Sequence, residues 1–141
     1  MADSRERELV QAVRAELAAI DPPRACCREA ERGGLGAAAL GQARSPVVAR
    51  LAVRLAESAS GDGGGVPATF DWGPARDHCR AAWLRGRFLA VGSLSLGARG
   101  AHLELVVPTD EGEELRRRLD DAGFRLPMRE RRGRAVLTSK R

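Results

Sequence analysis

The spacing of apolar residues predicts amphipathic helices in the first part of the chain. Over residues 4–20, apolar side chains recur at intervals of three and four, and charged side chains fill the positions between them. Pro22 and Pro23 follow and end this segment, because proline lacks the amide hydrogen that a helix needs. Ser45 and Pro46 then begin a second helix that runs to about residue 58, since serine caps a helix and proline suits its first position.

Beyond residue 92, the pattern changes to the alternation that is typical of strands. It predicts strands at residues 93–96, 103–107, 124–128 and 135–139. In the third of these, Phe124, Leu126 and Met128 would face the core. Thr109 or Asp110 would cap a helix that Gly123 closes. With the helix expected after Pro74, two helices would cover one face of a four-stranded antiparallel sheet, an α+β layer.

Small side chains line one face of that expected helix, which begins with Pro74 and includes residues 76–91. Wound at a hundred degrees per residue, its narrow face consists of Ala75, Cys79, Ala82, Gly86 and Ala90. Residues of this size let the backbone of another helix approach closely. The face therefore predicts a contact with a second helix.

Residues 25–40 are a weaker copy of the same pattern. When Cys27 is placed on Cys79, Gly34 falls on Gly86 and Ala38 falls on Ala90. Chance agreement in a chain rich in alanine, arginine and glycine is the alternative explanation. The repeat predicts that the two helices pack, within one chain or between two, across a seam made of Gly34, Ala38, Cys79, Ala82, Gly86 and Ala90.

These patterns divide the chain into three parts. Residues 1–58 form a helical N-terminal part that contains the degenerate first repeat, and residues 74–141 form a complete second repeat. Residues 59–73 between them are expected to be a flexible, glycine-rich linker. Their glycines do not follow the spacing of a phosphate-binding loop, so we do not expect a nucleotide site there.

The charge balance adds a candidate partner. The chain has 24 lysine and arginine residues and a formal net charge of +5, and Lys140 is the only lysine. Such a balance favours an anionic partner, first of all double-stranded DNA, although an organism that prefers arginine would produce it too. No apolar run is long enough to cross a membrane and no signal peptide is recognisable, so we expect a cytoplasmic, nucleoid-associated protein with reduced thiols.

The order of elements and residues 84–92 (LRGRFLAVG) resemble one repeat of the LAGLIDADG homing-endonuclease fold. Residues 78–109 are more closely similar to the second repeat of the WhiA family of sporulation-linked regulators, and residues 26–31 (CCREAE) to the start of its first repeat. The resemblance covers the family's N-terminal domain in shortened form. Residues 41–45 stand where a hairpin belongs, and the family's helix-turn-helix has no counterpart in these residues.

The resemblance also implies which chemistry is missing. LAGLIDADG nucleases bind their catalytic metal with an acidic residue just before the last motif glycine, whereas this chain has Val91 there and Ala39 in the first copy. Leu89 replaces the other motif acid. We therefore expect no catalytic residues, no cofactor and no metal. Cys26, Cys27 and Cys79 would be able to bind a metal only if the two helix starts meet, and the family resemblance accounts for them without one.

In the nuclease fold, the open face of the sheet lies in the DNA major groove. The resemblance therefore points to the outward arginines of the C-terminal hairpin as DNA-binding residues, namely Arg125, Arg129, Arg131, Arg132 and Arg134. The expected function is that of a WhiA-like, catalytically inactive DNA-binding protein in transcription regulation, in sporulation or cell division. The alternatives are a protein-interaction or dimerisation module, for instance a homodimer without DNA contacts, and a decayed copy with little function.

Overall fold

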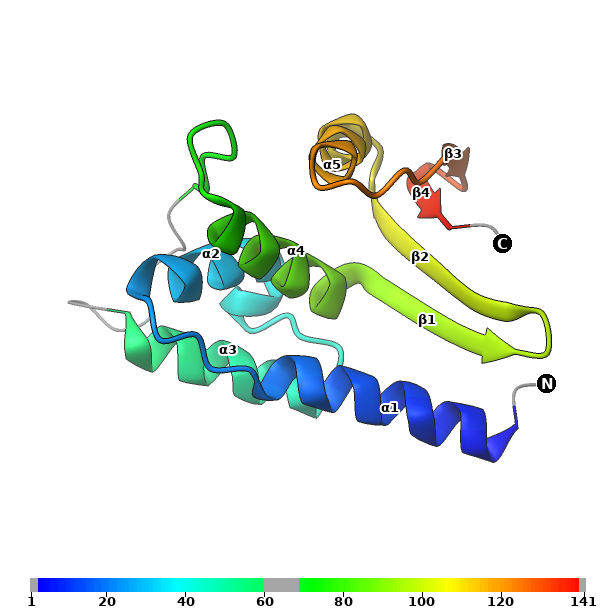
Figure 1. Cartoon of the computed structure of the whole chain (residues 1–141), viewed down its shortest axis with the longest axis horizontal. Helices are drawn as coiled ribbons and strands as arrows, with labels where there is room; N and C mark the ends of the chain where they lie inside the picture. The colour runs from blue at the N-terminus through cyan, green and yellow to red at the C-terminus, as the bar shows by residue number, and fades with distance from the viewer. Residues whose placement is uncertain (1–2, 60–68, 140–141) are drawn as a thin grey trace. The chain divides into compact units, whose positions relative to one another are not determined.

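The computed structural model describes residues 3–59 and 69–139, and its fold class is α+β (Figure 1). Five α-helices and a 3-10 helix lie in this part of the chain: α1 (Ser4–Ala19), α2 (Ala25–Leu35), η1 (Gly36–Leu40), α3 (Pro46–Ser58), α4 (Asp77–Val91) and α5 (Thr109–Asp121). The strands are β1 (Gly92–Gly97), β2 (Gly100–Pro108), β3 (Met128–Arg131) and β4 (Arg134–Thr138). Every described helix is too short or too polar to cross a lipid bilayer.

The chain divides into two compact units. One unit is helical and consists of Arg14–Ala90, and the other contains the sheet and consists of Met1–Val13 and Val91–Arg141. The sequence patterns predicted a different division, in which the helix that is now α4 belongs with the sheet that follows it. In the structure α4 belongs to the helical unit, and α5 is the helix that packs on β2, β3 and β4.

The helical unit is held together by a small aliphatic core. Ser45 caps α3 as expected, and its Oγ accepts a hydrogen bond of 3.2 Å from the amide of Val48. This cap sets the start of the helix, and the apolar stripe of α3 packs against α1, α2 and η1. The core consists of Ala18, Leu35, Ala38, Val48, Leu51, Ala52, Leu55 and Leu89.

The backbones of α2 and α4 touch where the two helices cross. A Cβ atom at Gly34 would overlap the carbonyl oxygen of Trp83, and one at Gly86 would overlap the carbonyl oxygen of Glu31. Glycine is therefore required at both positions, since no side-chain movement relieves a clash with a backbone atom. The other residues of the predicted seam are placed nearby: Cys79 and Ala82 are buried, Ala38 lies in the core, and Ala90 packs against it.

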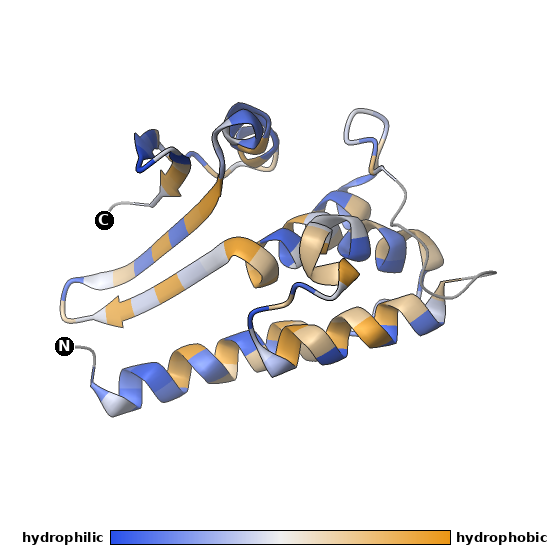
Figure 2. Cartoon of the chain, turned by 180° about the vertical axis from the view of Figure 1, so that it is seen from behind, coloured by the Kyte–Doolittle hydropathy of each residue, from blue (hydrophilic) through white to orange (hydrophobic). Residues whose placement is uncertain are grey.

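The sheet is antiparallel with strand order β1-β2-β4-β3. Its register pairs Leu94 with Leu103 and Leu105 with Leu137, and alternating hydropathy along β1 and β2 is visible in Figure 2. On α5, Gly112 faces Ala135 and Met128 of the sheet. Alternate residues therefore form one face under α5 and a second face that α5 does not cover.

The start of β3 differs from the expected one. The strand expected at residues 124–128 begins only at Met128, and Phe124 is 56% exposed instead of facing the core. Gly123 adopts a φ of +90°, and the amide of Phe124 donates 2.8 Å to the carbonyl of Leu119. This closing turn of α5 uses the residues that alternation assigned to the strand. Leu126 is buried as expected.

The start of α5 also differs from the expectation. Neither Thr109 nor Asp110 caps the helix, because the cap position is Pro108 and no side chain bonds there. Thr109 instead donates a hydrogen bond of 2.8 Å from its Oγ1 to the carbonyl of Gly133. The threonine therefore ties the start of α5 to the β3–β4 turn.

The expected linker at residues 59–73 includes residues 60–68, which lie outside the described part of the chain. The part that follows does not behave as a linker, because Trp72 is buried and its ring lies edge-on to Trp83 with centroids 5.8 Å apart. Arg80 lies over the Trp72 ring and donates a hydrogen bond of 2.9 Å to its carbonyl. Pro74 belongs to the turn before α4 and is not its first residue.

Candidate nucleic-acid interface and a thiol–histidine cluster

Four arginines gather on the hairpin formed by β3 and β4. The turn is made by Arg132 and Gly133, whose φ values of +53° and +75° match the two-residue turns that suit the twist of a hairpin. The register pairs Arg131 with Arg134 and Arg129 with Val136. The hairpin thus carries three arginines on its two strands and a fourth, Arg132, in the turn between them.

Arg129, Arg131 and Arg134 share the face of the sheet that α5 does not cover. Ala135 and Met128 face α5, and strand residues alternate between the two faces. A hollow of about 340 Å³ on this unit is lined by Val106, Arg131, Arg132, Arg134 and Val136. Three positive groups around one hollow form a surface suited to an anion such as a phosphate.

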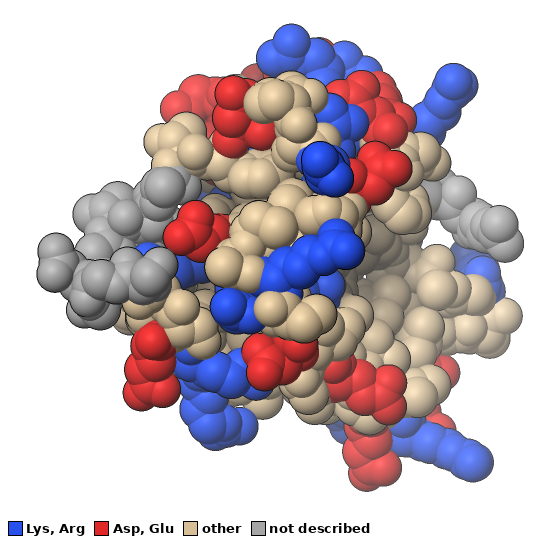
Figure 3. Space-filling view, turned by 60° about the vertical axis from the view of Figure 1, so that its left-hand side comes forward, with Lys and Arg blue, Asp and Glu red and all other residues tan. Residues whose placement is uncertain are grey.

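One carboxylate partly neutralises this surface. Glu104 on β2 accepts a hydrogen bond of 3.1 Å from Arg131, and its other oxygen lies 3.9 Å from Nε2 of His102. Within residues 3–59 and 69–139, no carboxylate pairs with Arg129, Arg132 or Arg134. On the face shown in Figure 3, by contrast, positive and negative side chains are interspersed.

Arg125 does not lie on a strand of the sheet. It lies in the segment between α5 and β3, where it is exposed, because the strand starts three residues later than expected. The alternation that placed it beside Arg129 and Arg131 therefore does not apply. Its assignment to the sheet face was wrong.

The positions that correspond to nuclease acids carry no carboxylate. Leu89 is 1% exposed and lies in the helical core, Ala39 lies in η1, and Val91 is the last residue of α4. Within the described residues, the one group of three or more histidine, cysteine or acidic residues close enough to share an ion contains no acid at all. That group is the thiol–histidine cluster.

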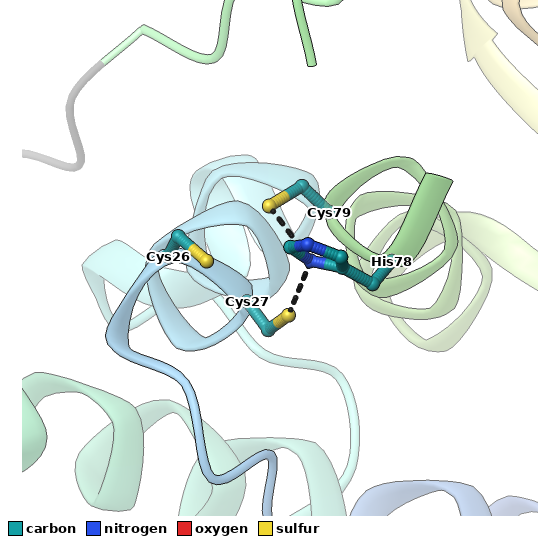
Figure 4. Close-up of side chains that lie close together, drawn as sticks. All are labelled: Cys26, Cys27, His78 and Cys79. Atoms are coloured by element: carbon teal, nitrogen blue, oxygen red, sulfur yellow. Dashed lines mark hydrogen bonds between the residues drawn. The ribbon is translucent and has the colours of Figure 1, made fainter. Parts of the chain in front are cut away.

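The thiol–histidine cluster consists of Cys26, Cys27, His78 and Cys79 (Figure 4). The first two residues lie in the first turn of α2, and the other two lie in the first turn of α4. Their sulfur and nitrogen atoms are all within 4.8 Å of one another. Nδ1 of His78 lies 3.1 Å from Sγ of Cys27 and 3.3 Å from Sγ of Cys79.

The cysteines of the cluster differ in burial and in acidity. Cys27 and Cys79 are buried, whereas Cys26 is exposed. Burial raises the pKa of the Cys79 thiol to about 11 and also raises the pKa of Cys27. A hydrogen bond with Cys79 lowers the pKa of Cys26. Burial therefore favours the neutral thiol forms of Cys27 and Cys79.

The sequence patterns indicated the cysteines of this cluster but not the place of the histidine. The alignment of Cys27 with Cys79 came from the internal repeat, and a shared site was conditional on the two helix starts meeting. They do meet, because the close crossing at Gly34 and Gly86 holds α2 and α4 together. A histidine in the first turn of a helix is most often a surface residue, but His78 is half-buried between the thiols of Cys27 and Cys79.

Neither protein-family models nor curated proteins gave a match to this chain.

Proposed function

We propose that this protein binds double-stranded DNA through the β3–β4 hairpin and acts in transcription regulation as a WhiA-like, catalytically inactive LAGLIDADG domain. The observation that carries the proposal is the grouping of Arg129, Arg131 and Arg134 on the sheet face that α5 leaves uncovered, with Arg132 at the turn. The order α4-β1-β2-α5-β3-β4, expected from the resemblance, supports it.

Guanidinium groups bind phosphate oxygens with two parallel hydrogen bonds, which suits arginines held on the rigid edge hairpin of a four-stranded sheet. Binding of this kind depends on charge and carries little sequence information. We therefore expect affinity in the micromolar range or weaker at physiological salt, as is usual for non-specific contacts, on the order of 10⁻⁶ to 10⁻⁴ M.

The first prediction concerns the hairpin arginines. Replacing Arg129, Arg131, Arg132 and Arg134 together by glutamine removes four charges and should weaken duplex binding by at least about tenfold at low salt, equally for unrelated sequences. The measurement is fluorescence anisotropy with labelled duplexes of random sequence. A matched variant loses the same charge elsewhere through substitution of the exposed residues Arg5, Arg7, Arg44 and Arg50.

Arg14 is left out of the matched variant because it has a structural role. It donates a hydrogen bond of 2.7 Å to the carbonyl of Leu89 and lies over the ring of Phe88. If both four-residue variants lose affinity equally, net charge explains the binding and the hairpin is not the site. If the wild-type chain binds no duplex even at low salt, a protein-interaction or dimerisation module becomes the better proposal.

The second prediction is the absence of nuclease activity. Leu89, Val91 and Ala39 offer no oxygen ligand for a divalent cation, and such an ion needs carboxylates to activate water near a phosphate. Supercoiled plasmid incubated with the chain and magnesium or manganese should remain uncut. Cleavage that co-elutes with the protein in gel filtration would contradict the prediction.

A further inference from the structure

We propose that Cys26, Cys27, His78 and Cys79 bind a single Zn²⁺ ion in a tetrahedral site that joins the first turns of α2 and α4. The inference is independent of DNA binding, because it concerns the helical unit alone. It rests on the convergence of four side chains from two helices that are far apart in the sequence (Figure 4).

The separations of the donor atoms fit one ion of this size. Zinc–sulfur bonds of about 2.3 Å and zinc–nitrogen bonds of about 2.0–2.1 Å place tetrahedral ligands roughly 3.6–3.8 Å apart. In the structure two of the three sulfur–nitrogen pairs are 3.1 and 3.3 Å apart, and no pair of donor atoms exceeds 4.8 Å. Small rotations of the four side chains therefore suffice to surround a cation.

The types of ligand atom in the cluster indicate which metal it would bind. Three sulfurs and one imidazole nitrogen are soft and borderline ligands, which favour zinc over magnesium, calcium or manganese. A cysteine-ligated iron–sulfur cluster places several iron and sulfide atoms between its ligands, so it needs more space between them than a single ion does. The close spacing of the four donors thus favours one ion.

Two features of the helices prepare the site. Each helix begins at the cluster, so the four ligands lie in first turns that are close together. The contacts at Gly34 and Gly86 hold the two helices in close contact farther along. The exposed Cys26 gives a cation access from solvent, while the buried Cys27 and Cys79 shield it once bound.

The bound zinc ion would have a structural role. Four protein ligands fill a tetrahedral zinc ion and leave no position for a substrate or water. Each cysteine gives up its thiol proton to solvent as a zinc–sulfur bond forms, and the neutral imidazole donates through a ring nitrogen. The bound ion would fix the starts of α2 and α4 and would thereby stabilise the helical unit.

The test uses the full chain, reduced and stripped of metal, and titrates it with Co²⁺ as a probe. We expect one equivalent of Co²⁺ to give the visible absorption of tetrahedral cobalt with sulfur-to-cobalt charge transfer, and Zn²⁺ to displace it. Zn²⁺ should also raise the melting temperature of the wild-type chain. Both readouts report on metal binding without requiring any activity.

Three substitutions and one control make the test specific. Cys26→Ser, Cys79→Ser and His78→Ala should each weaken binding by about 100-fold or more, since even loss of a residue that only supports a ligand costs 10- to 100-fold. Cys26 is exposed, so its variant keeps the core intact. The matched control is His102→Ala, which removes the other histidine of the chain, on β2, and should leave binding unchanged.

Several results would overturn the proposal. They are an octahedral cobalt spectrum, a stoichiometry other than one, or an equal loss of affinity in His102→Ala. A fourth is a disulfide between two of these cysteines in the purified chain combined with no metal uptake after reduction. That last result would identify the cluster as a redox-active thiol pair.

Discussion

Replacing Gly86 by alanine is expected to destabilise the helical unit by about 3 kcal/mol or more, the upper part of the range for overpacked cores. The added Cβ would overlap the carbonyl oxygen of Glu31 and would lie 3.1 Å from the amide nitrogen of Leu35. Both atoms belong to the backbone of α2, so the two helices must separate to accept the methyl group. Their separation would also loosen the core beneath them.

The sign of the change in unfolding free energy distinguishes a buried Gly86 from an exposed one. In an ordinary helix, alanine is more favourable than glycine by about 1 kcal/mol, so an exposed Gly86 would give a more stable variant. Chemical unfolding followed by tryptophan fluorescence measures the change, because Trp72 and Trp83 both lie in the helical unit. Gly97→Ala is the control, since no atom lies within 4 Å of its added Cβ, and it should change stability by less than about 0.5 kcal/mol.

Replacing Arg85 by methionine is expected to cost about 3–5 kcal/mol, which is typical when one partner of a buried ion pair is removed. The side chain of Glu31 is 0% exposed, and Arg85 donates to its two oxygens at 3.1 and 3.0 Å. Without the guanidinium, a carboxylate would remain in the interior with no compensating charge. The loss of stability therefore reflects the cost of the unpaired buried charge on Glu31 more than the strength of the Arg85–Glu31 ion pair.

A double variant separates these two contributions. Glu31→Met combined with Arg85→Met removes both charges and should recover at least half of the loss, because apolar replacements of a buried pair are often close to neutral. Arg116→Ala, which breaks the exposed pairs with Glu113 and Asp120, is the control and should have little effect. A double variant as unstable as Arg85→Met alone would show that the pair contributes through packing.

Local sequence patterns predicted the secondary structure well wherever a single helix or strand determines it. The helix at residues 4–20 and the cap at Ser45 depend on neighbouring residues only. The repeat even aligned Gly34 with Gly86, because a close crossing requires small residues in both helices. The α+β class followed from the order of these elements.

Features that depend on tertiary contacts were harder to predict from the sequence. Trp72 was assigned to a linker because glycines precede it, and its burial depends on Trp83 and Arg80 in α4. Phe124 and Arg125 fitted a strand pattern, but the closing turn of α5 took precedence. The thiol–histidine cluster needed the crossing angle and register of two helices, which no spacing along the chain contains.

The salt dependence of duplex binding tests the proposed function most directly. If the hairpin arginines contact phosphates, the slope of log affinity against log salt should be shallower in the variant lacking Arg129, Arg131, Arg132 and Arg134. The expected decrease is up to about 3.6, since each phosphate contact contributes roughly 0.9. Parallel slopes for wild type and variant would contradict binding by the hairpin.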